Sequence, residues 1–216
     1  MNIILFGPPG SGKGTQADKL VENLNLYKVS TGDLLRDEIN NKTVLGGKIK
    51  ILIDKGNFVS DEIINDLIIN IISNKKLSNC LIFDGYPRNI NQAKNLDEML
   101  IKYKQKISCV LSLRVENDIL LKRILGRQVC SKCGIVFNKF FNPANTNNHE
   151  CESQYLKTRA DDTQDTIMKR LNTYSKVTLP LIKYYQKQDL VKEIDGNGKI
   201  DQIHEEISNI IKSLGT

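Results

Sequence analysis

Five short apolar segments recur along the chain, each bounded by polar or turn-forming residues. They are NIILF at 2–6, YKVS at 27–30, NCLIFD at 79–84, ISCVLSLRV at 107–115 and LVKEID at 190–195. Brief apolar runs bounded in this way are typical of buried β-strands. The pattern therefore predicts five short strands in the interior of the protein.

Helical periodicity appears between these segments. It is clearest in KGTQADKLVENL at 13–24, DEIINDLIINII at 61–72 and NQAKNLDEML at 91–100. Strands that alternate with helices favour a parallel sheet covered by helices on both faces. We therefore predict an α/β fold, a three-layer sandwich whose ligand crevice lies at the carboxyl ends of the strands.

Two stretches interrupt the alternation. Residues 31–59 keep a helical pattern without a strand, and residues 127–159 are rich in Asn, Cys and Phe with little helical period. Both are interpreted as insertions in the sandwich. The expected division is a core of residues 1–29, 60–126 and 160–216, with one insertion at 30–59 and a second at 127–159.

Composition adds a weaker constraint. A chain of 216 residues with 40% hydrophobic content can bury the core of one main domain. The 31 basic and 25 acidic residues give a net charge of +6, which suits polyanionic ligands such as nucleotides. No apolar run approaches the roughly 20 residues that span a bilayer, and the first strand leaves no room for a targeting peptide. We expect a soluble, cytoplasmic protein without a membrane partner.

The segment GPPGSGKGT, from Gly7 to Thr15, follows the first strand directly. Glycines at Gly7, Gly10 and Gly12 allow successive backbone N–H groups to turn inward and bind an anion at the start of a helix. Lys13 adds a point charge for the β- and γ-phosphates of a nucleotide. An ordinary glycine turn does not require this spacing, so the segment predicts a phosphate-binding loop.

The loop departs from the general pattern at one position. Gly14 stands where Ser or Thr normally offers a hydroxyl to Mg²⁺, and Thr15 comes one residue later. The magnesium that accompanies a nucleotide then needs another protein partner. Asp84, at the end of NCLIFD, is the candidate because it should emerge at the same sheet edge as the loop.

The five cysteines fall into two groups. Cys80 and Cys109 lie in apolar runs and are expected in the core. Cys130, Cys133 and Cys151 lie in the second insertion, where Cys-x-x-Cys followed by a further cysteine predicts a metal site rather than a disulfide in a reducing compartment.

The ordered motifs resemble the adenylate kinases, a family of nucleoside monophosphate kinases, in their long-lid form. These motifs are GPPGSGKGT, STGDLLR at 30–36, DGYPRN at 84–89, ILGRQV at 124–129 and TRADD at 158–162. The resemblance covers essentially the whole chain. It implies a phosphate-loop core, an AMP-binding insertion at 30–59 and a lid at 127–159 that closes over ATP. It further implies Mg-dependent transfer of the γ-phosphoryl group of ATP to AMP, giving two ADP, by a protein that we expect to be a monomer.

Only seven of the 31 basic residues are arginines, and all but Arg114 occupy positions where the family binds phosphate. Arginine binds phosphate with a rigid two-pronged geometry that lysine lacks. The resemblance assigns Arg36 and Arg88 to the AMP phosphate, and Arg123 and Arg127, on the helix entering the lid, to ATP. It assigns Arg159 and Arg170 to both phosphate chains, with Asp161 and Asp162 as possible partners of these arginines.

The resemblance also implies contacts outside the arginine set. Gln92, four residues after Arg88 and expected on the same helix face, offers a donor and an acceptor to the adenine edge of AMP. Tyr86 replaces a family phenylalanine, with little effect expected. The remaining predicted nucleotide contacts are Gly10, Ser11, Gly12, Gly14, Thr15, Thr31, Gly32, Val59, Gly85, Phe137 and, near the donor base, Gly198.

The three lid cysteines resemble a structural zinc site found in some adenylate kinases. There the fourth ligand is Cys or Asp, but this chain has Gln154 at that position. A neutral amide is a poor zinc ligand beside thiolates. His149, Glu152 or water is therefore left to complete the site, unless metal is bound weakly or not at all.

Two other functions use the same loop and sheet. One is an ATPase with a zinc ribbon for nucleic acid or a protein partner, but the cysteine-bearing insertion has few basic residues, so no nucleic-acid partner is expected. The other is a kinase for UMP or CMP, or one that uses GTP as donor. Thr31 and Gln92 favour AMP as the acceptor, whereas the donor base is poorly specified.

Overall fold

The computed structural model describes residues 1–54 and 59–214. Residues 55–58, which belong to the expected insertion at 30–59, and residues 215–216, at the end of the expected core, lie outside the described residues.

The described residues form the following elements in chain order. The strands are β1 (Asn2–Phe6), β2 (Tyr27–Ser30), β3 (Leu81–Asp84), β4 (Ile107–Arg114), β5 (Arg127–Cys130), β6 (Val136–Asn138), β7 (Leu156–Lys157) and β8 (Val191–Asp195). The α-helices are α1 (Lys13–Leu24), α2 (Thr31–Asn40), α3 (Val44–Asp54), α4 (Asp61–Ile72), α5 (Ile90–Lys102), α6 (Asn117–Leu125), α7 (Gln164–Thr173), α8 (Pro180–Gln186) and α9 (Ile200–Leu214). Short helical turns occur at Lys75–Leu77 and Ser153–Tyr155, and a π-helical turn at Tyr174–Thr178 joins α7 to α8.

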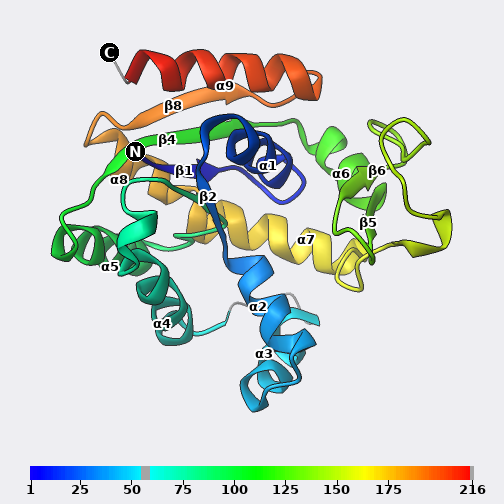
Figure 1. Cartoon of the computed structure of the whole chain (residues 1–216), viewed down its shortest axis with the longest axis horizontal. Coiled ribbons are helices and arrows are strands. Elements are labelled where there is room, and N and C mark those ends of the chain that lie inside the picture. The colour runs from blue at the N-terminus through cyan, green and yellow to red at the C-terminus, as the bar shows by residue number, and fades with distance from the viewer. Residues whose placement is uncertain (55–58, 215–216) are drawn as a thin grey trace.

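A parallel sheet lies at the centre of the molecule, in the order β2-β3-β1-β4-β8 (Figure 1). All five predicted strands are confirmed. In the centre of the sheet, Leu5 pairs with Asp84 of β3 on one side and with Leu111 of β4 on the other. The carboxyl ends of β1 and β3 are therefore level, which brings the glycine-rich loop and Asp84 to the same edge.

Helices cover both faces of this sheet, which confirms the three-layer α/β fold (Figure 1). On one face, α9 buries Ile203, Ile207 and Ile211, spaced four residues apart, beside α1. On the other face, α4 buries Ile64, Ile68 and Ile72 with the same spacing, beside α5 and α8. Apolar residues at this interval share one side of a helix, which is why both helices pack against the sheet.

Two parts of the chain project from the sandwich (Figure 1). Helices α2 and α3 form the first, and α2 begins where Ser30 Oγ accepts a hydrogen bond from the Asp33 N–H over 3.2 Å. The second is a small antiparallel sheet in the order β6-β5-β7. We call the segment 127–159, which holds this sheet, the lid segment.

The described residues contain no helix that combines the length and the apolar character needed to cross a membrane. Of the two cysteines expected in the core, Cys109 is buried, and Cys80, directly before β3, is half-buried and packs against the core.

Candidate active site

The loop between β1 and α1 adopts a conformation that only glycine tolerates easily. Gly10 and Gly12 have φ angles of 82° and 95°, in the left-handed region. A methyl group at Gly10 would also lie 2.6 Å from Cγ1 of Ile124, so helix α6 approaches the loop too closely for a side chain there. The half-buried Lys13 donates hydrogen bonds from Nζ to the carbonyl oxygens of Gly7 at 2.7 Å and Pro8 at 3.0 Å.

Asp84 lies directly beside this loop, as its position at the end of β3 predicted. A methyl group at Gly14 would lie 3.5 Å from Oδ2 of Asp84. The carboxylate is close enough to Lys13 to oppose the lowering of the lysine pKa. A hard carboxylate oxygen next to a phosphate-binding loop fits a magnesium ion held mainly by phosphate oxygens and water.

Several cations from distant parts of the sequence converge on the loop. Burial lowers the pKa of Lys13 to about 8; Asp84 opposes this shift, and Arg88, Arg170 and Arg127 add to it. These three arginines come from the turn before α5, from α7 and from β5. Like charges at such proximity disfavour one another unless anions lie between them. The surroundings of the phosphate loop are therefore electrostatically suited to a ligand with several negative charges.

The arginines show the same crowding among themselves. Burial and then the nearby Arg170 lower the pKa of Arg88 to about 10, although Asp84 opposes the change. Burial, followed by the charges of Arg127 and Arg36, lowers the pKa of Arg159 to about 10.

All six arginines assigned to phosphate are half-buried, whereas Arg114 is exposed and pairs with Glu193 on the surface. The distinction that the sequence suggested between Arg114 and the other six is thus present in the fold.

Thr31 and Arg88 meet on the side of the crevice that faces α2. Thr31 Oγ1 donates to the Gly85 carbonyl over 2.9 Å, and Arg88 Nε donates to the same carbonyl over 2.7 Å. Arg36 lies one turn further, where its guanidinium covers Gly32 and pairs with Asp33. These contacts join Thr31 to Arg88, and Arg36 is close enough to Arg88 to contribute to the lowering of its pKa.

Gln92 is only 3% exposed and lies next to Arg88, but not as the sequence suggested. Helix α5 begins at Ile90, with Asn89 as its N-cap, so Arg88 precedes the helix and shares no helix face with Gln92. The two residues meet because the Arg88 N–H donates to Gln92 Oε1 over 2.7 Å. On its other side, the amide Nε2 donates to Oδ1 of Asp61 over 2.6 Å.

Charged side chains also join the two ends of the lid segment. Arg127 is the first residue of β5 rather than part of the preceding helix, and it pairs with the buried Asp162. Asp161 accepts a hydrogen bond from Arg170 Nη1 over 2.9 Å. Asp162 was expected to hold Arg159 or Arg170, but its closest partner is Arg127, and Arg170 is 4.0 Å away. Arg123 Nη1 donates to the Ser11 carbonyl over 3.3 Å, which places it against the phosphate loop.

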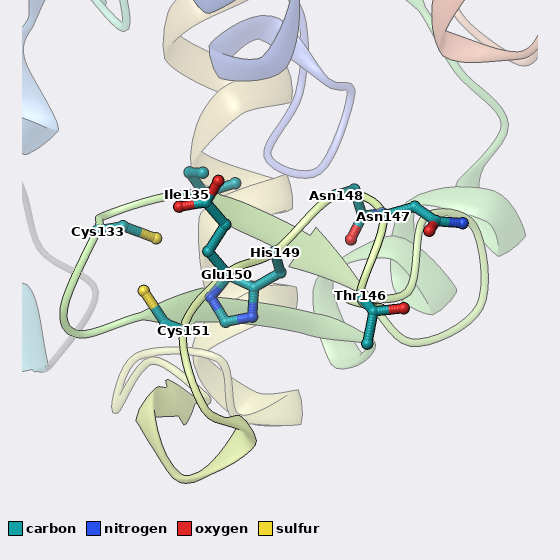
Figure 2. A pocket seen from close by; sticks show the side chains of 8 residues that line it. All are labelled: Cys133, Ile135, Thr146, Asn147, Asn148, His149, Glu150 and Cys151. Atoms are coloured by element: carbon teal, nitrogen blue, oxygen red, sulfur yellow. The ribbon is translucent and has the colours of Figure 1, made fainter.

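The three lid cysteines gather with His149 at one end of the small sheet. The four ligand atoms of Cys130, Cys133, Cys151 and His149 all lie within 4.8 Å of one another. Figure 2 shows Cys133, Cys151 and the His149 ring among the residues that line a pocket there. Gln154 and Glu152, the other candidates for a fourth ligand, are hydrogen-bonded to each other over 2.8 Å. Three thiols and an imidazole form a donor set that suits tetrahedral zinc.

The pKa shifts of two of these thiols also fit a bound zinc ion. Burial disfavours the Cys130 thiolate, but hydrogen bonds from the Cys133 N–H and His149 outweigh burial and lower its pKa to about 6. Burial and hydrogen bonds to Cys133 and Cys130 raise the pKa of Cys151 to about 11. The Cys130 thiolate is therefore favoured, whereas the Cys151 thiolate is disfavoured. A dication would allow all three thiols to ionise.

Comparison with known proteins identifies the family. A sequence model described as adenylate kinase matches residues 5–190. The chain is 47% identical over 212 residues to an adenylate kinase of Pelagibacter ubique (strain HTCC1062), covering 98% of this chain and 100% of the relative. It is 43% identical over 216 residues to an adenylate kinase of Methanothrix thermoacetophila (strain DSM 6194) and 40% identical over 216 residues to one of Clostridium acetobutylicum (strain ATCC 824). Both of these alignments cover 99% of this chain and 100% of the relative.

The chain belongs to the adenylate kinase family. Adenylate kinases are nucleoside monophosphate kinases, that is, ATP:AMP phosphotransferases. The resemblance stated from five motifs is confirmed, and so is the phosphate-loop α/β fold that it implied.

Three residues that the adenylate kinase resemblance assigned to nucleotide contacts lie outside the phosphate-binding loop and the arginine cluster. Val59 is 6% exposed and packs in the core, and Phe137 is 3% exposed with its ring edge-on to His149 in the lid segment. Gly198 lies in the loop after β8, near Gln202 and Ile203, and that loop ends where Gln16 Nε2 donates to the Ile200 carbonyl over 3.0 Å. Their nucleotide contacts, like those of the other residues assigned to the site, stay predictions.

Two acidic residues of the site were missed in the sequence. Asp33 pairs with Arg36 and lies 3.5 Å from Lys28 Nζ, and Asp61 binds the Gln92 amide. Both lie in the first turn of a helix, where acidic residues are common because they favour the helix dipole. Asp61 is distinguished by its contact with Gln92, 31 residues away, which the sequence pattern does not contain. The Asp33–Arg36 pair is local, and its three-residue spacing on a helix is a signal that the sequence does contain.

The hydroxyl of Tyr86 also has a role that a phenylalanine lacks. The ring is 1% exposed, and its hydroxyl lies 2.9 Å from Asn65 Oδ1 and 3.3 Å from the Gln92 carbonyl oxygen. Tyr86 therefore links α4 to the start of α5, in addition to the packing that was expected of the ring.

Proposed function

We propose that this protein transfers the γ-phosphoryl group of ATP reversibly to AMP, forming two molecules of ADP. The observation that carries the proposal is the convergence of Lys13 with Arg88, Arg127 and Arg170 beside the Asp84 carboxylate. Two nucleotides whose phosphate chains face each other need cations on both sides to neutralise their negative charge. Membership of the adenylate kinase family supports the same reaction.

The reaction needs alignment and charge neutralisation more than proton transfer. A phosphate oxygen of AMP attacks the γ-phosphorus, and the bond from that phosphorus to the β–γ bridging oxygen breaks, so ADP leaves with the electron pair. The attacking oxygen is already ionised, and no general base is required. Because the transition state spreads negative charge over the three equatorial oxygens, fixed cations stabilise it.

The cations divide between the two substrates. Lys13 and the N–H groups of Gly10, Ser11, Gly12, Gly14 and Thr15 hold the ATP phosphates, with Arg123 and Arg127 facing the same chain. Arg36 and Arg88 hold the AMP phosphate beside Thr31 and Gly85. Arg159 and Arg170 lie between the two chains at the moment of transfer.

The nucleotide is bound as a magnesium complex in this proposal. Magnesium supplies neutralisation of the β- and γ-phosphate oxygens when it is bound. Asp84 is the residue that would hold it, directly or through water, because its carboxylate lies against Gly14. The absence of a hydroxyl at position 14 leaves room for this arrangement.

Closure of both insertions completes the site. Water that reached the γ-phosphorus would accept the phosphoryl group in place of AMP, so an open site would hydrolyse ATP. The helices α2 and α3 and the lid segment project from different parts of the sandwich (Figure 1). We propose that the first closes over AMP and the second over ATP.

The lid segment carries a structural zinc ion in this account. Cys130, Cys133, Cys151 and His149 would hold it, since their ligand atoms lie within 4.8 Å of one another. Such an ion stiffens a segment that has little apolar core of its own. The protein otherwise acts as a cytoplasmic monomer with small-molecule partners and no nucleic acid.

The proposal is tested by following ADP formation from ATP with each monophosphate in turn. AMP should be the preferred acceptor, with UMP, CMP and GMP at least about tenfold slower in kcat/KM. Preference for a pyrimidine monophosphate would assign a different acceptor. The same assay with GTP in place of ATP measures the donor preference.

A further inference from the structure

The side-chain amide of Gln92 is held on both sides by groups that can act in only one way. Its Oε1 accepts from the backbone N–H of Arg88 over 2.7 Å, and its Nε2 donates to Oδ1 of Asp61 over 2.6 Å. A backbone N–H only donates, and a carboxylate only accepts. The amide therefore has one allowed orientation, with oxygen toward Arg88 and nitrogen toward Asp61.

Asp61 is itself fixed relative to Gln92. Asn89 donates from Nδ2 to both carboxylate oxygens of Asp61 over 3.1 Å, and its Oδ1 accepts from the Gln92 N–H over 2.8 Å. Asn89 is the N-cap of α5, while Asp61 begins α4. The carboxylate is thus attached to the end of the helix that carries Gln92, although 31 residues separate it from Gln92 in the sequence.

The fixed amide still has capacity for a ligand. A carboxamide offers two N–H donors and two acceptor positions on oxygen, so one of each remains after the protein contacts. The edge of adenine offers an acceptor at N1 and a donor at its 6-amino group, which matches these two. A 6-oxopurine offers the reverse pattern, a donor at N1 and an acceptor at O6.

An amide that could rotate by 180° would accept either pattern. Rotation of Gln92 would place Oε1 against the Asp61 carboxylate and Nε2 against the Arg88 N–H, so that two acceptors and two donors would face each other. Buried polar groups left without a partner are costly, and repulsion adds to that cost.

We propose that Asp61 is a positioning residue that makes the acceptor site select adenine over 6-oxopurines, because it prevents rotation of the Gln92 amide. The inference rests on the proposed function, in which Gln92 binds the AMP base. Asp61 touches no reacting atom and acts only through Gln92.

The test compares AMP with IMP, which differ only at this edge of the base. Initial rates with magnesium ATP give kcat/KM for both acceptors in the wild type and in Asp61→Asn. Asparagine has nearly the same shape but offers a donor as well as an acceptor, so a rotated Gln92 regains a partner. The ratio of kcat/KM for AMP to that for IMP should fall at least about tenfold, mainly through the KM values.

The ratio is insensitive to a loss of folded protein, because both acceptors are assayed on the same preparation. Asp66→Asn is the matched control, since Asp66 is exposed on the same helix and loses the same charge; its ratio should equal that of the wild type. An Asp61→Asn ratio unchanged from the wild type overturns the inference.

Gln92→Leu separates this inference from the proposed function. If its AMP-to-IMP ratio falls toward one together with that of Asp61→Asn, the inference is supported. If Gln92→Leu still discriminates as the wild type does, base selection lies elsewhere and the inference is overturned while ATP:AMP transfer stands. A wild type that phosphorylates no monophosphate overturns the proposed function, and the inference with it.

Discussion

Arg127 donates hydrogen bonds from Nε and Nη2 to the two carboxylate oxygens of Asp162, the first of them over 2.8 Å. Arg127 enters the lid segment, and Asp162 lies just beyond its end. The side chain of Asp162 is 0% exposed and that of Arg127 is 17% exposed. The base of the lid segment is therefore closed by a two-pronged, desolvated ion pair, which is the strongest geometry for this combination of groups.

Asp162→Asn should lower the free energy of unfolding by about 3 kcal/mol, because it leaves a largely buried guanidinium without its counter-charge. Urea denaturation measures the change. Glu193→Gln is the control, since the Arg114–Glu193 pair is exposed, and it should cost less than about 1 kcal/mol. Equal effects of the two substitutions on the free energy of unfolding would show that burial of the Arg127–Asp162 pair adds nothing to stability.

The pH dependence of catalysis should follow Lys13. Its pKa of about 8 lies below the ordinary lysine value, so the free protein loses this charge as the pH rises through about 8. The kcat/KM for ATP reports the free enzyme and should decline above that pH. Bound phosphates favour the charged lysine, so the decline in kcat should begin at higher pH.

Lys13→Arg keeps its charge throughout this pH range and is the control for the assignment. The kcat/KM of this variant, however low, should show no decline near pH 8. A wild-type kcat/KM that stays constant to pH 10 would contradict the role of Lys13.

Arg88→Lys should reduce kcat by roughly 10³-fold, the scale seen when an arginine that stabilises phosphoryl transfer is lost. Lysine keeps the charge but cannot bind the Gly85 carbonyl and a phosphate with one rigid planar group. Arg114→Lys, on the surface, should leave kcat unchanged. A loss of less than tenfold in Arg88→Lys would reduce Arg88 to a residue that helps to position AMP.

The purified protein should contain close to one zinc per chain by elemental analysis. Cys130→Ser and His149→Ala should both lose the metal and melt at lower temperature, with phosphoryl transfer still detectable in the cold. Gln154→Ala should keep the zinc, because Gln154 is hydrogen-bonded to Glu152 and a neutral amide is a poor zinc ligand beside thiolates. No zinc after refolding with excess metal would make the lid segment a metal-free variant.

Local patterns predicted the core elements well. The helices Lys13–Leu24 and Asp61–Ile72 have the predicted bounds: Gly12 and Ser60 precede their first residues, and the apolar spacing continues to their ends. The lid strands were not predicted. Arg127–Cys130 and Val136–Asn138 are short and half polar, and no periodic apolar face distinguishes such strands from loop.

The ordered motifs predicted residues that the fold does bring together, whereas several contacts between distant segments were missed. Asp84 lies beside the phosphate loop, and Arg88, Arg127 and Arg170 are close enough to Lys13 to lower its pKa. The catalytic and binding roles of these residues stay predictions. The Asp61–Gln92 contact, the Asp162–Arg127 pair and the contact of the Tyr86 hydroxyl with Asn65 join segments that are far apart in the sequence. His149 was one of several possible fourth ligands, and only the folded lid segment brings it beside the cysteines.

The central claim is that the phosphoryl group passes from ATP to AMP and not to water. Phosphorus NMR of wild-type protein mixed with magnesium, ATP and AMP tests it directly, with Lys13→Met as the inactive control. Two ADP should appear for each AMP consumed, ADP alone should return ATP and AMP, and no inorganic phosphate should accumulate. Inorganic phosphate formed at the expense of ATP, with AMP unchanged, would contradict the account and make the protein an ATPase.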